Sequence, residues 1–216
     1  MLAWKKVSRM VGCQGFVLVG GQSRRMGRDK ALLPFGDPPL ANWMAEKVRA
    51  ACGNVTLVGS SAKYSGLGVF LIEDAYPEQG PLAGIHAALR YSTAQYNLIV
   101  GCDMPYVSTD FLAWLLESAQ KSGADVTIPE SEGFEYEPLC AVYATRCLGA
   151  VEEALNRKDR AIRNLLGRLQ VRVVLTAEWR VFDQHGKMFR NLNTAGDYES
   201  ARAELLTDRG RSRGLS

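Results

Sequence analysis

A glycine-rich segment with several positive charges is the part of the sequence best suited to bind a charged ligand. It spans residues 18–30 and reads LVGGQSRRMGRDK. Gly20 and Gly21 leave room for backbone N–H groups to approach an anion, because neither residue has a Cβ atom. Arg24 and Lys30 add positive charge, and an arginine can hold a phosphate through two parallel hydrogen bonds. The segment therefore indicates a site for a polyphosphate.

The order of residues in this segment differs from two common nucleotide-binding motifs. It lacks the Gly-Lys-Ser/Thr ending of a P-loop, and its glycines do not have the G-x-G-x-x-G spacing of dinucleotide-binding enzymes. A dehydrogenase is therefore disfavoured. The residue types leave one plain alternative open, an exposed basic loop that binds nothing.

Two aspartates follow apolar runs and could contact a metal or a nucleotide. Asp103 comes shortly after residues 97–100 and precedes Pro105, and Asp74 comes after residues 69–72. Mg²⁺ is usually held by one or two carboxylates together with phosphate oxygens and waters. Asp103 is our candidate for that role. Each aspartate has the alternative of a turn residue at the end of a strand.

Short apolar runs alternate with amphipathic stretches, which predicts strands alternating with helices. We expect strands at residues 15–19, 55–58, 69–72, 97–100, 125–128, 139–143 and 171–175. We expect helices at residues 40–52, 81–92, from 108 or 109 onward, 148–156, 161–166 and 196–206. Such strands form a mostly parallel sheet that helices cover on both faces. Ligands bind beyond the carboxyl ends of the strands in these folds.

Length, charge and cysteine usage restrict the class of protein. We expect one α/β domain within the 216 residues, with residues 1–14 as a loose leader and 208–216 as a basic tail. The net charge of +3 is too small to indicate a nucleic-acid partner. No apolar run approaches the roughly 20 residues of a membrane span. Five cysteines without metal-binding spacing indicate reduced thiols in a cytoplasmic protein, and Cys102 is expected to be a small buried side chain.

Several separated motifs resemble those of the molybdenum cofactor guanylyltransferases, a family of the nucleotidyltransferase superfamily. The glycine-rich segment continues into Ala-Leu-Leu, and it is followed in order by IED at 72–74, GPLAGI at 80–85, CDMP at 102–105, EP at 137–138 and NLNT at 191–194. The resemblance covers about residues 15–204. It implies a Rossmann-like three-layer sandwich with a mostly parallel sheet, of the nucleotidyltransferase type, over residues 15–207.

The resemblance implies an enzyme that transfers GMP from GTP to molybdopterin and releases pyrophosphate. Two anions meet in this reaction, so positive charge and Mg²⁺ matter more than a proton acceptor. The GTP-binding positions carried over from the family are Leu18, Val19, Gly20, Gly21, Lys30, Asp74 and Asp103. The catalytic positions are Arg24, Lys30 and Asp103, of which Asp103 is also the metal ligand.

The resemblance also identifies positions on the molybdopterin side of the site. The acceptor-binding positions are Gly84, Pro138 and Asn193. Packing of a helix against the sheet would explain Gly84 equally well, and an Asn-Thr cap for the last helix would explain the NLNT motif. The chain continues with Ala-Gly-Asp at 195–197, where the family often has Pro-Glu, and this departure predicts a looser turn into that helix.

The sequence leaves two other functions open. The first is a sister nucleotidyltransferase that uses CTP or a sugar-phosphate acceptor. Gly21, as part of the Gly20-Gly21 pair, favours GTP, because guanylyl enzymes of the family tend to have Gly-Gly where many relatives that use other nucleotides have Ala-Gly. The second is a GTP-binding module without turnover. The expected substrates are GTP and molybdopterin, and the family implies a cofactor-delivery protein or a molybdoenzyme as partner, with no nucleic acid and no membrane.

Overall fold

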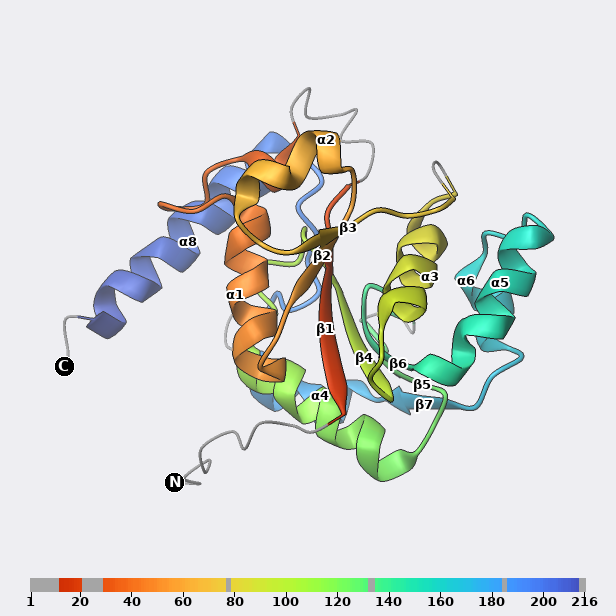
Figure 1. Ribbon diagram of the computed structural model, residues 1–216. Helices are drawn as coiled ribbons and strands as arrows, with labels where there is room; N and C mark the ends of the chain where they lie inside the picture. Colours follow the sequence, from red (N-terminus) through yellow and green to blue (C-terminus); the bar gives the residue numbers. More distant parts are fainter. Residues whose placement is uncertain (1–11, 21–28, 77–78, 132–134, 184–185, 214–216) are drawn as a thin grey trace.

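The computed structural model describes residues 12–20, 29–76, 79–131, 135–183 and 186–213, with side chains up to residue 207 in the last range. Gly21 and Arg24, two positions predicted to contact GTP, therefore lie outside the described residues. Figure 1 shows helices on both faces of a central sheet.

Seven strands in the described part of the chain form one sheet. They are β1 (Cys13–Leu18), β2 (Thr56–Val58), β3 (Leu71–Ile72), β4 (Tyr96–Gly101), β5 (Val126–Pro129), β6 (Cys140–Ala144) and β7 (Val171–Val174). Their order across the sheet is β3-β2-β1-β4-β6-β5-β7. β6 runs antiparallel to β4 and β5, while the other neighbouring pairs are parallel. The predicted mostly parallel sheet is confirmed, and every strand begins and ends within two residues of its expected position.

The antiparallel direction of β6 has a consequence for the site. In the register of the sheet, Leu18 of β1 lies opposite Gly101 of β4, and Val100 of β4 lies opposite Cys140 of β6. The carboxyl ends of β1 and β4 therefore meet the amino end of β6 at one edge. Residues that precede β6 reach the same place as residues that follow β1 and β4.

Helices cover the sheet in two layers. The longer ones are α1 (Leu40–Cys52), α3 (Pro81–Tyr91), α4 (Thr109–Ser122), α5 (Leu148–Asn156) and α8 (Ala195–Arg213), and the shorter ones are α2 (Ser61–Tyr64), α6 (Ile162–Leu166) and α7 (Thr176–Trp179). Four 3-10 turns accompany them in the described residues, at η1 (Lys30–Leu32), η2 (Ser65–Leu67), η3 (Thr145–Cys147) and η4 (Arg180–Phe182). α1 and α4 pack together on one side of the sheet, and α3 and α5 pack together on the other (Figure 1).

Local sequence signals account for several helix boundaries. The Ser108 hydroxyl accepts a hydrogen bond from the Phe111 N–H at 3.1 Å and caps α4, which begins where a helix was expected. Gly53 ends α1 in the left-handed conformation. α8 is longer than the helix expected at 196–206, because it continues to Arg213. Arginine is a good helix former, so the charged sequence there does not end the helix.

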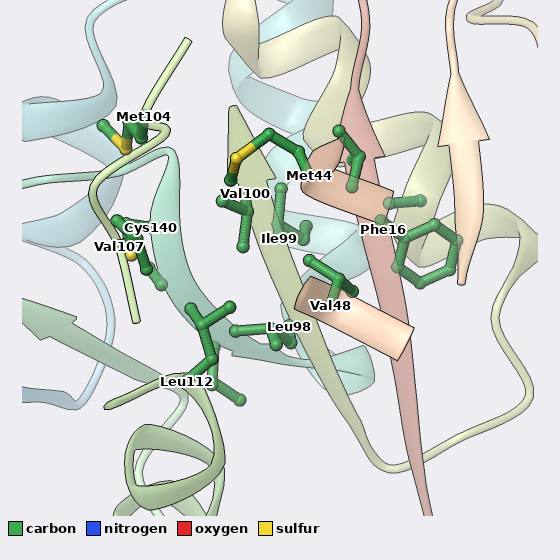
Figure 2. Close-up of a cluster of buried hydrophobic side chains, with 14 of the residues drawn as sticks. Phe16, Met44, Val48, Leu98, Ile99, Val100, Met104, Val107, Leu112 and Cys140 are labelled. Carbon is green, nitrogen blue, oxygen red and sulfur yellow. The ribbon is translucent and has the colours of Figure 1, made fainter. Parts of the chain in front are cut away.

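One hydrophobic core joins the sheet to the helices. Figure 2 shows part of it, in which Met44 and Val48 of α1 and Leu112 of α4 gather with side chains of β4, such as Leu98 and Val100. These five side chains are fully buried. The core holds β4 against α1 and α4, and Asp103 follows shortly after the end of β4.

Two further predictions concern the thiols and the membrane. All five cysteines are buried and free of disulfides. Among the residues that the structure describes, no helix is both long enough and apolar enough to cross a membrane.

Candidate active site

An ion pair between Lys30 and Asp103 forms the centre of the candidate site. The Lys30 Nζ atom lies 2.7 Å from Asp103 Oδ2. Asp103 follows β4, and Lys30 opens η1, for which Asp29 is the N-cap. The two side chains are 15% and 22% exposed, so both are largely shielded yet reachable. The fold thus brings together two predicted catalytic residues that are 73 positions apart.

A third segment joins this pair through its backbone. The Leu192 N–H donates to the Asp103 carbonyl oxygen at 2.9 Å, and the Leu192 carbonyl accepts from Lys30 Nζ at 3.2 Å. The NLNT motif at 191–194 therefore lies against the Lys30–Asp103 pair. The sequence did not indicate Leu192, because this residue contacts the pair through its backbone N–H and carbonyl, which nearly every residue type carries.

Asp197 holds the same segment at the start of α8. Its Oδ2 atom accepts from the Thr194 N–H at 2.9 Å and from the Asn193 N–H at 3.3 Å, while Arg190 donates to Oδ1 at 2.9 Å. The Thr194 hydroxyl accepts in return from the Asp197 N–H at 3.1 Å, which completes a reciprocal cap. Asp197 restrains this turn by hydrogen bonds, and a turn looser than the family's Pro-Glu would give stays a prediction. The Asn193 side chain is exposed, and its contact with the acceptor stays a prediction.

The cap at Asp197 predicts a pH-dependent contribution to stability. The hydrogen bond from the Thr194 hydroxyl, followed by the Arg190 guanidinium, lowers the pKa of Asp197 from 3.8 to about 2. Because the folded-state pKa is the lower one, the carboxylate stabilises the fold fully above about pH 4, and this contribution is lost as the pH falls through 2. We expect Asp197→Asn to be less stable than the wild type at pH 6, with the difference shrinking toward pH 2.

Denaturant unfolding between pH 6 and pH 2 measures this difference. Asp37→Asn, at an exposed aspartate, is the control and should follow the wild type. A difference for Asp197→Asn that is the same at every pH would contradict the charged cap.

The end of β1 lies next to the same edge. The Leu18 carbonyl accepts from the Cys102 N–H at 3.2 Å, and the Val19 N–H donates to the Val58 carbonyl at 2.9 Å. Gly20 follows and is exposed. The predicted GTP positions Leu18, Val19 and Gly20 thus flank Asp103 at the carboxyl end of the sheet.

Gly84 packs α3 against the end of β1. A Cβ atom at Gly84 would lie 2.8 Å from Leu18 Cδ1, so a larger residue would push the helix or Leu18 aside. This contact supports the packing alternative for Gly84. Its contact with the acceptor stays a prediction.

Asp74 carries an unpartnered polar atom. It follows β3, and its Oδ1 atom is buried with no hydrogen-bond partner in the described part of the chain. A buried carboxylate oxygen without a partner is costly, and such groups in native proteins usually have a role. This oxygen is able to accept a hydrogen bond from a bound nucleotide, as the resemblance implies for Asp74.

Glu137 and Pro138 precede β6 and so reach the edge from the other side. The Pro138 carbonyl accepts from the buried Tyr143 hydroxyl at 2.9 Å. Burial raises the pKa of Glu137, and the negative charges of Glu135 and Asp103 raise it further, against a hydrogen bond from Ser131. The Glu137 carboxyl therefore lies close enough to Asp103 for the negative charge of Asp103 to raise its pKa. The sequence did not indicate this proximity.

The residues present fit a metal ion that is held mainly by its substrate. The described ranges contain no cluster of three or more His, Cys, Asp or Glu residues that could hold a metal. Asp103 offers a single carboxylate, a hard oxygen donor beside a predicted phosphate site. Mg²⁺ suits this arrangement, because it commonly takes one or two carboxylates and completes its shell with phosphate oxygens and waters.

Cys102 lies beside Asp103 but is unsuited to be a nucleophile. Its side chain is 2% exposed. Burial, together with the negative charge of Asp103, raises the pKa of the thiol to about 12. Since the reactive form of cysteine is the thiolate, this thiol is inert at neutral pH. The expectation of a small buried side chain is confirmed.

Comparison with known proteins identifies the family. A family model described as the MobA-like NTP transferase domain matches residues 15–173. The chain belongs to this family. Among its relatives, a protein of Pelotomaculum thermopropionicum named probable molybdenum cofactor guanylyltransferase is 32% identical over 89% of this chain and 93% of that protein. A molybdenum cofactor guanylyltransferase of Desulfosudis oleivorans is 31% identical over 90% of this chain and 96% of that protein.

Solved structures agree with this membership. The crystal structure of molybdopterin-guanine dinucleotide biosynthesis protein A from Archaeoglobus fulgidus matches with a TM-score of 0.78 and 30% identity, covering 90% of this chain and 99% of that one. A 2-C-methyl-D-erythritol 4-phosphate cytidylyltransferase from Thermus thermophilus matches with a TM-score of 0.62 and 18% identity, covering 88% and 97%. The second likeness concerns the fold alone. The MobA-like NTP transferase family therefore has the nucleotidyltransferase fold that the sequence predicts.

Proposed function

We propose that this chain transfers GMP from GTP to molybdopterin, forming the guanine dinucleotide cofactor and releasing pyrophosphate. The observation that carries the proposal is the Lys30–Asp103 pair at the carboxyl end of β1 and β4, in a member of the MobA-like NTP transferase family. The names of the relatives, molybdenum cofactor guanylyltransferase, support the choice of GTP and molybdopterin.

The reaction is a direct displacement at phosphorus. A phosphate oxygen of molybdopterin forms a bond to the α-phosphorus of GTP, and the bond from that phosphorus to the oxygen that bridges to the β-phosphate breaks. Pyrophosphate leaves with the electron pair of that bond. No protein nucleophile takes part, which agrees with the high pKa of about 12 for the Cys102 thiol.

Fixed positive charge is what the protein contributes to this step. Lys30 binds phosphate oxygens of GTP, and Arg24 binds them as a second cation. Asp74 accepts a hydrogen bond from the nucleotide. The nucleotide also contacts the backbone of Leu18, Val19, Gly20 and Gly21. Gly84, Pro138 and Asn193 contact the acceptor. Positive charge that is already in place where negative charge develops stabilises the transition state far more in a shielded site than in water.

Asp103 is the residue that would hold Mg²⁺. When bound, the ion would neutralise negative charge on the phosphate oxygens of the nucleotide. Lys30 forms an ion pair with the same carboxylate. The lysine and the ion would therefore both attract the triphosphate of GTP to the position next to Asp103.

Two further expectations belong to this proposal. The reaction takes place in the cytoplasm, an inference supported by five cysteines that form no disulfide. A cofactor-delivery protein or a molybdoenzyme receives the product, an inference that the family resemblance alone supports.

A product assay tests the proposed reaction. Purified protein is incubated with molybdopterin, Mg²⁺ and either GTP or CTP, and pyrophosphate and the dinucleotide are followed by mass spectrometry. A guanine dinucleotide formed with GTP and no product with CTP is the expected result. A cytosine product would keep the chemistry and overturn the choice of base. Tight binding of Mg-GTP without product would favour a binding module or another acceptor.

Gly101 offers a way to move Asp103 without changing it. A Cβ atom at Gly101 would lie 2.8 Å from Asp103 Oδ1, so in Gly101→Ala the carboxylate must shift. We expect transfer to fall about tenfold or more, because small displacements at a reacting centre are costly. The fold should lose little stability, since the displaced atom lies at the far end of a side chain and not in the backbone.

Gly149→Ala in α5 is the matched control, because a Cβ atom there meets open space. It should leave turnover unchanged and raise stability slightly, since alanine favours a helix over glycine. Wild-type turnover in Gly101→Ala would show that the position of the Asp103 carboxylate is not critical.

A further inference from the structure

A buried tyrosine contacts Asp29, the residue that precedes Lys30. It belongs to a helix that lies outside the sequence motifs. Tyr64 ends α2, and it is 1% exposed. Its hydroxyl donates a hydrogen bond of 2.6 Å to Asp29 Oδ2. The two residues are 35 positions apart, so the contact depends on the tertiary fold.

Asp29 uses both of its carboxylate oxygens. Oδ1 accepts from the Ala31 N–H at 3.1 Å and caps η1, whose first residue is Lys30. Oδ2 is the atom that Tyr64 holds. The orientation of this carboxylate therefore sets the direction of η1 and the position from which Lys30 reaches Asp103.

The ring of Tyr64 also packs at the end of β2, beside β1. A Cβ atom at Gly59 would lie 3.0 Å from Tyr64 Cδ2 and only 2.2 Å from the Val19 carbonyl oxygen. The missing side chain at Gly59 lets the ring and the Val19 backbone approach the same point. Tyr64 thus contacts the surroundings of both ends of the glycine-rich segment. It lies close to Val19 near the start of the segment, and it hydrogen-bonds Asp29 near its end.

The hydroxyl is suited to a constant structural role. Burial of Tyr64, with the Asp29 carboxylate beside it, raises the pKa of the phenol far above neutrality. The hydroxyl stays protonated and remains a hydrogen-bond donor to Asp29.

We propose that Tyr64 is a positioning residue for nucleotide binding, which acts through Asp29 to hold Lys30 toward Asp103 and the phosphates of GTP. The inference rests on the proposed function, in which Lys30 binds those phosphates. Tyr64 itself does not touch the reacting atoms. Its effect should therefore fall on the affinity for the triphosphate and not on the guanine base or on molybdopterin.

Tyr64→Phe removes the hydroxyl and keeps the buried ring. We expect the variant to bind Mg-GTP about tenfold more weakly by calorimetry, because a hydrogen bond to a charged group is lost. Binding of guanosine and the KM for molybdopterin should stay within about twofold of the wild type. Tyr91→Phe is the matched control, because Tyr91 is 43% exposed and packs against Phe16 and Phe70 away from Asp29.

A second pair of variants tests whether Tyr64 acts through Lys30. In a Lys30→Ala background, Tyr64→Phe should weaken Mg-GTP no further, since the group that it positions is gone. An equal tenfold loss in both backgrounds would overturn the proposal, as would unchanged Mg-GTP affinity in Tyr64→Phe itself. A simple loss of packing would instead weaken guanosine and Mg-GTP alike, and that result would also overturn it.

The binding measurements separate this inference from the proposed reaction. A wild-type protein that binds Mg-GTP but makes no product would contradict the reaction, while the Tyr64→Phe affinities would still decide the role of Tyr64. If Tyr64→Phe does not fold, Asp29→Asn tests the same link from the other partner. It should weaken Mg-GTP but not guanosine, and unchanged Mg-GTP affinity in that variant would overturn the proposal.

Discussion

Asp103→Ala should lower formation of the guanine dinucleotide about a thousandfold or more, because the proposed metal ligand is lost at the centre of charge development. Asp103 is the carboxylate paired with Lys30 at 2.7 Å, and no cluster of acidic side chains in the described residues could replace it as a metal site. Product formation at several concentrations of Mg²⁺ measures the effect. Added Mg²⁺ should not restore the rate.

The fold should survive this substitution. Lys30 keeps its hydrogen bond to the Leu192 carbonyl and its contact with water. Circular dichroism and thermal unfolding test this, and Asp103→Asn serves as a second variant that keeps the shape of the side chain. Asp110→Ala, at an exposed aspartate in the first turn of α4, removes the same charge and should keep wild-type turnover. Near-normal product formation by Asp103→Ala would remove Asp103 from the metal site.

Lys30→Ala should weaken Mg-GTP by about ten- to a hundredfold, the range expected when a charged hydrogen bond to phosphate is lost. Guanosine has no phosphates, so its affinity should change by less than about twofold. Calorimetry with both ligands measures the contrast. The difference between the two ligands, not the loss of GTP binding alone, identifies a phosphate contact.

Lys121→Ala is the control for this charge change. Lys121 is 77% exposed on α4 and pairs only loosely with Glu117, at 3.5 Å. It should bind Mg-GTP as the wild type does. If Lys30→Ala weakened guanosine and Mg-GTP equally, the phosphate role of Lys30 would be ruled out.

Much of the fold could be predicted because the relevant signals are local. Apolar runs such as residues 97–100 show which strands are buried, and Ser108 and Gly53 mark helix ends through their own backbone contacts. The direction of β6 was not predictable in this way. An antiparallel strand in a covered sheet carries the same apolar sequence as a parallel one, so its direction depends on pairing with β4 and β5.

The residues of the candidate site could be predicted where a sequence motif contains the functional side chains. The expectation that Lys30 and Asp103 serve one site is supported by their ion pair. The segment at 191–194 was expected near the acceptor, but its bonds to this pair run through the Leu192 backbone. The restraint by Asp197 was not predicted, because it depends on the fold of the turn, which brings the aspartate three residues after Thr194 back to the Thr194 N–H.

By itself, the sequence determined the class of protein, the set of strands and helices and the resemblance to guanylyltransferases, and it led to the prediction of a polyphosphate site at residues 18–30. These depend on residue types, on their order and on periodicity, which are properties of the chain alone. Only the tertiary structure decided which groups meet: Lys30 with Asp103 and Leu192, Tyr64 with Asp29, and the start of β6 with the end of β4. Such contacts join positions up to 162 residues apart, and they exist only once the packed sheet has brought the ends of its strands to one edge.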